Sequence, residues 1–173
     1  EYQRKHMIER PSKRLAEGFD NVAYICPTCE TANSIVSDKN EIKCTHCNTI
    51  GSMNKYGFIE GFKYDNLVDW NNFQKPLSYK LLDTEFASDA ILYHADYNVE
   101  NKKRTKIGKV TFKYKNKAFE LTGAANEVIP FDQIKNPIIT LRRMFNFTYN
   151  DISYIVKLES HVMSFLRVVQ EKY

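Results

Sequence analysis

From residue 90 onward, apolar and polar positions alternate in short runs that predict antiparallel β-strands. In the first run, over 90–100, Ile91 and Tyr93 alternate with His94 and Asp96. Similar alternation predicts strands at 110–115, 118–121, 127–131, 138–141, 144–149 and 152–158. Two-residue turns are predicted at 116–117 and 150–151. This part of the chain is therefore predicted to contain seven short strands.

Two other segments repeat their apolar residues at helical spacing. The first begins after Asn66, a predicted N-cap, places Trp70 on its apolar stripe, and is expected to kink or restart at Pro76. The second lies at the C-terminal end, with Ser160 as its predicted N-cap, and its apolar positions are Val162, Phe165, Leu166 and Val169. Seven antiparallel strands closed by an amphipathic helix are typical of a pleckstrin-homology-like (PH-like) barrel.

Composition favours a chain of two small units. The 173 residues are 43% hydrophobic, which suffices for a small module and a domain of about 100 residues. No apolar run is long enough to span a membrane and the first residues are charged, so we expect a soluble chain without a secretory signal. The net charge of +4 is too small to indicate a nucleic-acid-binding protein by itself.

The four cysteines form two Cys-x-x-Cys pairs separated by 14 residues. Cys26, Cys29, Cys44 and Cys47 match the spacing of a zinc ribbon, in which two knuckles present four thiolates to a structural Zn²⁺. Two disulfides and a thioredoxin-type redox pair are disfavoured, because the chain shows neither a secretory signal nor a βαβ pattern. His46 lies inside the second pair and is interpreted as an exposed knuckle residue rather than a ligand.

The pattern as a whole predicts an α+β chain with four segments. These are a basic N-terminal arm (1–21), a zinc ribbon (22–64), a linking helix (65–86) and a small antiparallel PH-like β-barrel capped by a C-terminal helix (87–173). Trp70 is expected to be a packing anchor between the ribbon and the following domain. The tip of the ribbon mixes acidic and basic residues, which disfavours phosphate binding there.

The order of these parts resembles the C-terminal region of bacterial acyltransferases of the 1-acyl-glycerol-3-phosphate type. The resemblance rests on "YICPTC", "CTHC", "LVDWNNFQ", "GKVTF", "FELTG", "IPFDQI" and "FLRVVQEKY", and it spans almost the whole chain. It implies an upstream catalytic domain in a longer parent chain, bound to the inner face of the cytoplasmic membrane. One departure is Asn48, where such ribbons usually have glycine. Asn tolerates the left-handed backbone conformation, so we still expect zinc binding.

Catalysis in that family requires a His-x4-Asp motif, in which the histidine is the general base. This chain contains no such motif, because its four histidines are followed five positions later by Pro11, Gly51, Val99 and Leu166. A Gly-x-Ser-x-Gly elbow and a phosphate-binding loop are also absent from the sequence. We therefore expect this chain not to be an enzyme by itself.

Three functions remain open from the sequence. The favoured one is a non-catalytic accessory region that positions an acyltransferase domain at the anionic membrane surface. The alternatives are a nucleic-acid-binding zinc-ribbon protein, which the neutral ribbon tip disfavours, and a peptide-binding PH-like interaction module.

A basic run supports the membrane hypothesis. Between residues 101 and 119 the chain has eight lysines and arginines and no acidic residue. Lys102, Lys103, Arg104 and Lys106 are expected in the turn between the first two strands of the β domain. Cations at that position would contact anionic head groups, although a solvated loop would have the same composition.

Overall fold

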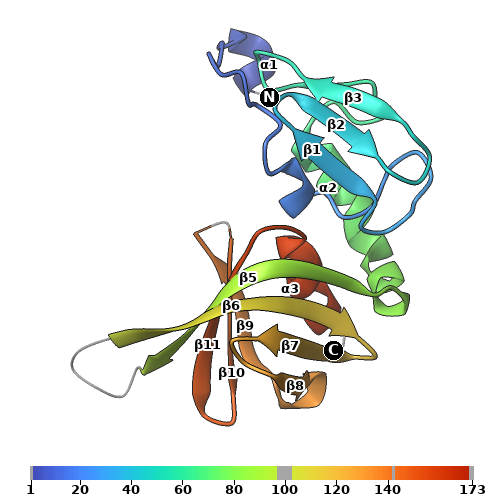
Figure 1. Ribbon diagram of the computed structural model, residues 1–173. Coiled ribbons are helices and arrows are strands. Elements are labelled where there is room, and N and C mark those ends of the chain that lie inside the picture. Colours follow the sequence, from blue (N-terminus) through green and yellow to red (C-terminus); the bar gives the residue numbers. More distant parts are fainter. Residues whose placement is uncertain (1, 97–102, 142, 172–173) are drawn as a thin grey trace. The chain divides into compact units, whose positions relative to one another are not determined.

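The computed structural model describes residues 2–96, 103–141 and 143–171, with the backbone alone at positions 96 and 103 (Figure 1). The chain divides into two compact units, Glu1–Lys80 and Leu81–Tyr173. One antiparallel sheet of four strands and one of seven strands are described. The coarse prediction of an α+β chain with antiparallel sheets and a cysteine cluster is therefore confirmed.

The first unit is built on a small sheet with the strand order β1-β2-β3-β4. Its strands are short because each one ends at a turn or a knuckle. Lys39, in the turn that joins the first two strands, has a φ of 50°. The elements of this unit are α1 (Tyr2–His6), a 3₁₀ turn (Phe19–Asn21), β1 (Ile35–Asp38), β2 (Glu41–Cys44), β3 (Ile50–Met53), β4 (Ile59–Glu60) and α2 (Leu67–Gln74).

The core of the first unit surrounds Trp70 on α2. Its indole ring is fully buried, and it meets the rings of Phe19 and Phe62 with centroid distances of 5.1 Å to each. Buried Cys26 and Cys44 belong to the same apolar cluster. Trp70 therefore packs within the core of residues 1–80, which Ala16 and Phe19 from the N-terminal arm join. Its predicted role as an anchor toward the following domain stays a prediction.

Helix α2 begins and ends where local chemistry requires. The side chain of Asn66 accepts hydrogen bonds from the backbone N–H groups of Val68 and Asp69, so the predicted N-cap is confirmed. The α-helix stops at Gln74, and a 3₁₀ segment, Lys75–Asp83, contains Pro76. Because proline lacks the N–H that would continue an α-helical ladder, the change at this point follows from the sequence.

The second unit contains the seven predicted strands. They are β5 (Phe86–Asp96), β6 (Lys103–Lys115), β7 (Ala118–Gly123), β8 (Glu127–Pro130), β9 (Lys135–Thr140), β10 (Met144–Tyr149) and β11 (Ile152–Leu158). A 3₁₀ turn (Phe131–Gln133) follows β8. Asn116-Lys117 and Asn150-Asp151 both have positive φ at their two residues, as the tight hairpin turns that were predicted require.

The seven strands form one curled sheet with the order β8-β7-β6-β5-β11-β10-β9, which has the shape of a half-barrel (Figure 1). Strands β5–β8 and β9–β11 are two meanders, and β5 pairs with β11 to join them. Across the curl, the phenol of Tyr154 on β11 donates a 2.8 Å hydrogen bond to Glu127 on β8. These two strands are not neighbours in the sheet, so the bond links the edge strand β8 to the inner strand β11.

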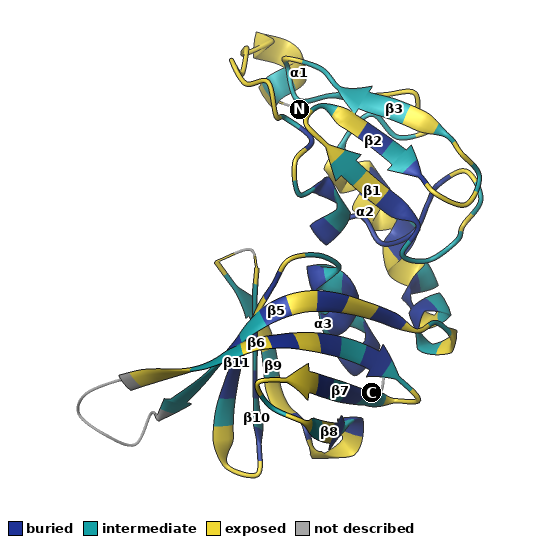
Figure 2. Ribbon diagram, in the orientation of Figure 1, coloured by how far each residue is buried: buried dark blue, intermediate teal, exposed yellow. Residues whose placement is uncertain are grey.

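An aromatic core fills the concave side of the half-barrel. Phe112, Phe119, Phe145 and Phe165 are fully buried, and the rings of Phe112 and Phe119 contact each other and both remaining rings. Phe165 comes from α3 (Val162–Gln170), a helix that is largely buried (Figure 2), and its ring contacts those of Phe112 and Phe119 on the sheet. The C-terminal helix therefore covers the sheet, as its apolar spacing predicted.

Several boundaries differ from the sequence prediction; strand β9, for example, is Lys135–Thr140 rather than 138–141. Strand β5 begins at Phe86 rather than at residue 90, and positions 97–100 of the predicted strand lie outside the described residues. Strand β6 begins at Lys103 rather than at 110. Helix α3 begins after His161, which has a φ of 58° and makes no side-chain capping bond, so the predicted cap at Ser160 is wrong.

The helices of the described residues include none with the length and apolar character needed to span a lipid bilayer.

Candidate metal centre

The two Cys-x-x-Cys segments fold into knuckles with the same backbone hydrogen bonds. In the first knuckle, Glu30 N–H donates to the carbonyl of Cys26 at 2.8 Å, and Cys26 N–H donates to the carbonyl of Thr31 at 3.1 Å. The second knuckle repeats this arrangement. Asn48 N–H donates to Cys44 at 3.0 Å, and Cys44 N–H donates to Thr49 at 2.9 Å. Each six-residue stretch is therefore one copy of the same local structure.

Both knuckles turn through a left-handed residue directly after their second cysteine. Asn48 has a φ of 59°, as its position in the motif predicted, and Glu30 has a φ of 56° at the equivalent place in the first knuckle. Asparagine adopts this conformation at modest cost, whereas glutamate is disfavoured there. The first knuckle therefore has a backbone cost that the second largely avoids.

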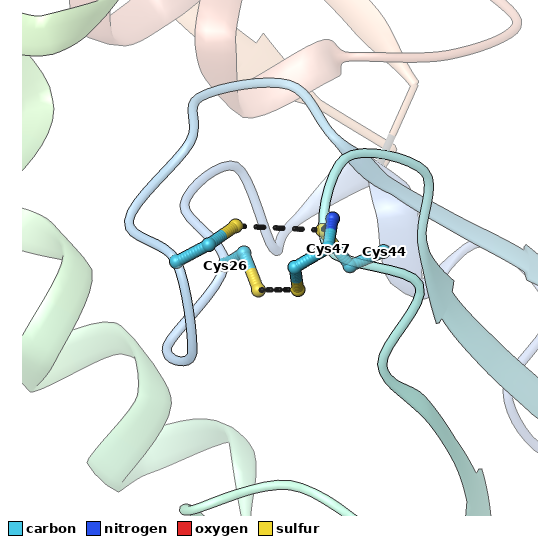
Figure 3. Close-up of side chains that lie close together, drawn as sticks. Cys26, Cys44 and Cys47 are labelled. Atoms are coloured by element: carbon cyan, nitrogen blue, oxygen red, sulfur yellow. Dashed lines mark hydrogen bonds between the residues drawn. The ribbon is translucent and has the colours of Figure 1, made fainter.

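The four sulfur atoms meet in one cluster. The Sγ atoms of Cys26, Cys29, Cys44 and Cys47 all lie within 4.8 Å of one another. The Cys26–Cys47 and Cys29–Cys44 pairs are 3.9 and 3.7 Å apart, and Figure 3 shows both contacts as dashed lines. A disulfide has sulfurs about 2 Å apart, so neither contact is a disulfide. This group could hold a metal ion.

Backbone and hydroxyl groups surround the sulfurs with polar contacts. In each knuckle backbone N–H groups point at the first cysteine. For example, Thr28 N–H donates to Cys26 Sγ at 3.4 Å, and Cys47 N–H donates to Cys44 Sγ at 3.5 Å. The hydroxyl two residues after the second cysteine also lies close to sulfur, at 3.4 Å for Thr31 and 3.1 Å for Thr49. N–H groups aimed at sulfur favour the thiolate form.

Burial and these polar contacts move the thiol pKa values in opposite directions. Burial raises the pKa of Cys26 to about 12, although the N–H groups of Cys29 and Thr28 act against it. The hydroxyl and N–H of Thr49 lower the pKa of Cys47 to about 6. For Cys44, burial raises the pKa, but hydrogen bonds from Cys47, Ser34 and His46 outweigh it and the pKa falls below its ordinary value. The hydrogen bonds around Cys44 and Cys47 therefore favour the thiolate form of these two residues.

His46 is exposed and lies outside the four-residue ligand group, consistent with its interpretation as a knuckle surface residue. The ligand set that the structure assembles consists of thiols alone.

Helix α2 holds the chain that leads into the first knuckle. The indole Nε1–H of Trp70 donates to the carbonyl of Ile25 at 3.0 Å. One turn later, Gln74 accepts from the N–H of Tyr24 at 2.9 Å and of Ile25 at 3.3 Å, and its Nε2 donates to the carbonyl of Val22 at 2.8 Å. Gln74 is only 2% exposed. Two side chains at i and i+4 thus satisfy buried backbone groups beside Cys26.

The role of Gln74 was missed by the sequence analysis. Trp70 was predicted to be a packing residue from its apolar stripe, but no role was predicted for Gln74. The available signal was a polar residue, Gln74, four positions after Trp70 and therefore on the core-facing side of the helix.

The predicted membrane-binding residues are placed differently from the prediction. Lys102 lies outside the described residues, and the side chain of Lys103 is not described. Arg104 and Lys106 are exposed, but they belong to strand β6, where they pair with Ala95 and Tyr93 of β5. The expectation that these two residues lie in a turn is wrong. Because strand β6 begins at Lys103, Arg104 and Lys106 are strand residues and project from one face of the sheet.

Comparisons with protein-family models, with curated proteins and with solved structures give no match to this chain.

Proposed function

We propose that the four cysteines hold one structural Zn²⁺ in a zinc ribbon. Four sulfurs placed tetrahedrally at about 2.3 Å from Zn²⁺ would be separated by about 3.8 Å. The separations of 3.7 and 3.9 Å between opposite knuckles agree with that edge length. An all-thiolate tetrahedral set suits zinc, and it leaves no coordination position for water or substrate. The metal would therefore stabilise the unit and take part in no reaction.

The proposal extends to the second unit, which we assign to the PH-like barrels. Supporting observations are the two meanders joined by β5 and β11, the strong curl of the sheet, and the covering helix α3 at the C-terminal end. Function does not follow from such a fold alone.

The function that we propose is a non-catalytic accessory region of a membrane-associated glycerophospholipid acyltransferase. The observation that carries it is the role of "LVDWNNFQ", one of the segments on which the family resemblance rests. Its Trp70 and Gln74 hold the backbone beside Cys26 of "YICPTC". Two separate motifs of the resemblance thus form one physical unit. The region would position an upstream catalytic domain at the anionic inner surface of the cytoplasmic membrane.

The two alternatives have less support. In the first unit, several exposed basic side chains form ion pairs with carboxylates, for example Arg4 with Asp65 and Lys55 with Glu9. Because these carboxylates partly neutralise the positive charge, phosphate binding there is disfavoured. A PH-like module that binds peptides by strand addition needs a free sheet edge. Both edge strands contain a proline, Pro130 in β8 and Pro137 in β9, and a proline has no N–H to donate to an added strand.

The test is sedimentation of the purified chain with lipid vesicles of two compositions. We expect weak binding to phosphatidylglycerol-rich vesicles, loss of binding near ~0.3 M salt by screening, and no binding to pure phosphatidylcholine. The same preparation should transfer no acyl group from acyl-coenzyme A to lysophosphatidic acid. Equal binding to both vesicles, or turnover that a point change in this chain abolishes, would overturn the proposal.

A further inference from the structure

The outer face of the half-barrel carries cations from three different strands, β6, β11 and β9. Strand register places side chains of neighbouring strands in rows on one face of a sheet. In the first row Ile91 of β5 lies between Lys109 of β6 and Lys157 of β11. Both lysines are exposed. Two cations therefore flank one apolar residue on the outer surface.

The next two rows continue the pattern. Tyr93 pairs with Lys106, and two residues further Ala95 pairs with Arg104. Along the second of these rows, the register runs from Ala95 through Ser153 and Thr148 to Lys135 on the edge strand β9. We call the set of Arg104, Lys106, Lys109, Lys135 and Lys157 the basic face. All five residues are exposed.

The basic face is not neutralised within its own rows. Among the residues that register places in these three rows, from β6 to β9, none is Asp or Glu. In the described part of the chain, no ion pair joins a residue of the basic face to a carboxylate, whereas Lys113 and Lys115, further along β6, both bind Glu85. Asp89 and Glu159 lie two residues beyond Ile91 and Lys157 along the chain, at the end of the face away from Arg104.

Exposed aliphatic side chains lie at the border of the same face. Ile138, in the row of Tyr93, is 55% exposed, and Leu141, just after β9, is 77% exposed. Aliphatic side chains contribute nothing to binding of phosphate groups in a nucleic acid. Beside a cationic surface, they are suited to the interface of a lipid bilayer, where apolar groups enter between head groups that the cations attract.

We propose that the basic face is the surface through which this chain contacts an anionic phospholipid bilayer, with Ile138 and Leu141 entering the interface. This inference deepens the proposed function and depends on it. It replaces the predicted loop site by a sheet surface that β6, β5, β11, β10 and β9 build together. The contact is electrostatic and spread over several residues, so it selects negative surface charge rather than one head group.

The experiment compares two triple variants of the full chain with equal changes in net charge. The face variant is Arg104→Glu, Lys106→Glu and Lys109→Glu. The control variant is Lys5→Glu, Lys13→Glu and Lys39→Glu, at exposed positions of the first unit. Binding is measured to vesicles of phosphatidylglycerol and phosphatidylcholine at low salt. We expect the face variant to bind at least about tenfold more weakly than the control, since each cation near such a surface contributes about 1 kcal/mol.

Each outcome decides between the two proposals. If the original chain binds anionic vesicles and the face variant binds as well as the control, the basic face is wrong while the proposed function stands. If the original chain binds no anionic vesicle, both are overturned. If the face variant loses binding to a 20-nucleotide single-stranded nucleic acid but still binds anionic vesicles, the basic face is a nucleic-acid-binding surface instead. If circular dichroism shows that the face variant does not fold, the same three residues are changed to glutamine instead. Leu141→Ser is measured beside it as an uncharged change at the border of the face.

Discussion

The side chain of Gln74 accepts a hydrogen bond from the backbone N–H of Tyr24 at 2.9 Å, two residues before the first cysteine of the metal cluster. The contact joins positions that are 50 residues apart in the chain. It shows that the knuckle does not depend on a metal alone for its position. Helix α2 supplies the hydrogen-bond partners that a buried, irregular backbone segment needs.

Replacing Gln74 by Ala should destabilise the first unit by about 2–4 kcal/mol. The substitution leaves the buried N–H groups of Tyr24 and Ile25 without their side-chain acceptor, and each unsatisfied buried group costs about 1–3 kcal/mol. Chemical denaturation of the zinc-loaded protein measures the change in unfolding free energy. Asn72→Ala, on the exposed side of the same helix, is the matched control and should change it by less than about 0.5 kcal/mol. Equal effects of the two changes would show that the bond to Tyr24 is unimportant.

Replacing Cys44 by Ser should release the metal and unfold the first unit selectively. Structural zinc sites contribute folding free energy directly, and the core around Trp70 includes Cys44 itself. The core of the second unit consists of different residues, so the β-sheet signal in circular dichroism should largely persist. Thr45→Ser, an exposed change beside it, should retain one metal ion per chain. A Cys44→Ser protein that keeps its metal and its full thermal transition would rule out this role for the thiolate.

Glycine at position 30 should stabilise the protein by up to about 1 kcal/mol. Glu30 has a φ of 56°, which glycine adopts without the steric cost that a Cβ imposes. The ion pair with Lys80 that Glu30→Gly removes is exposed and contributes little. Asn48→Gly, at the equivalent place in the second knuckle, should be nearly neutral because asparagine already tolerates this conformation. Thermal unfolding of both variants tests the difference. A destabilised Glu30→Gly protein would mean that the ion pair outweighs the backbone cost.

Tyr154→Phe should flatten the alkaline part of the stability profile. Burial, followed by the hydrogen bond to Glu127, raises the pKa of Tyr154 above its ordinary value. Above pH ~10 the unfolded chain releases this proton while the folded protein keeps it, so stability falls as pH rises. Removing the phenol should reduce that slope by up to about 1.4 kcal/mol per pH unit. Near pH 8, where neither state ionises, the variant should be less stable by about 1–2 kcal/mol through loss of the bond to Glu127.

The measurement is urea denaturation at intervals from pH 8 to 11. Tyr114, whose pKa is also raised by burial and by the charge of Asp83, remains in the variant and maintains part of the slope. Parallel profiles for the original protein and Tyr154→Phe would contradict the assigned pKa shift.

Local rules predicted the parts of the fold that local chemistry determines. The Asn66 cap, the two-residue turns at Asn116 and Asn150, and the left-handed Asn48 are all present. Each depends on the residue itself and its immediate neighbours. The cysteine cluster was equally predictable, because two knuckles of fixed spacing have few ways to present four thiols.

The parts that were missed depend on partners distant in sequence. Residues 103–109 are polar and were assigned to a turn, yet they form a strand because the backbone of β5 supplies its partners. Glu30 adopts a conformation that its own propensity opposes, since the knuckle requires it. The contact of Gln74 with Tyr24 joins helix α2 to an irregular segment 50 residues away, and no local pattern predicts which buried backbone groups need a side-chain partner.

The central claim is that the four cysteines together bind a zinc ion that organises the first unit. X-ray absorption at the zinc edge of the purified full chain tests it most directly, combined with elemental analysis. The account predicts one zinc per chain, with four sulfur neighbours at about 2.3 Å and no nitrogen or oxygen in the first coordination sphere. A metal-free native protein, or a site completed by a histidine or a water molecule, would contradict it.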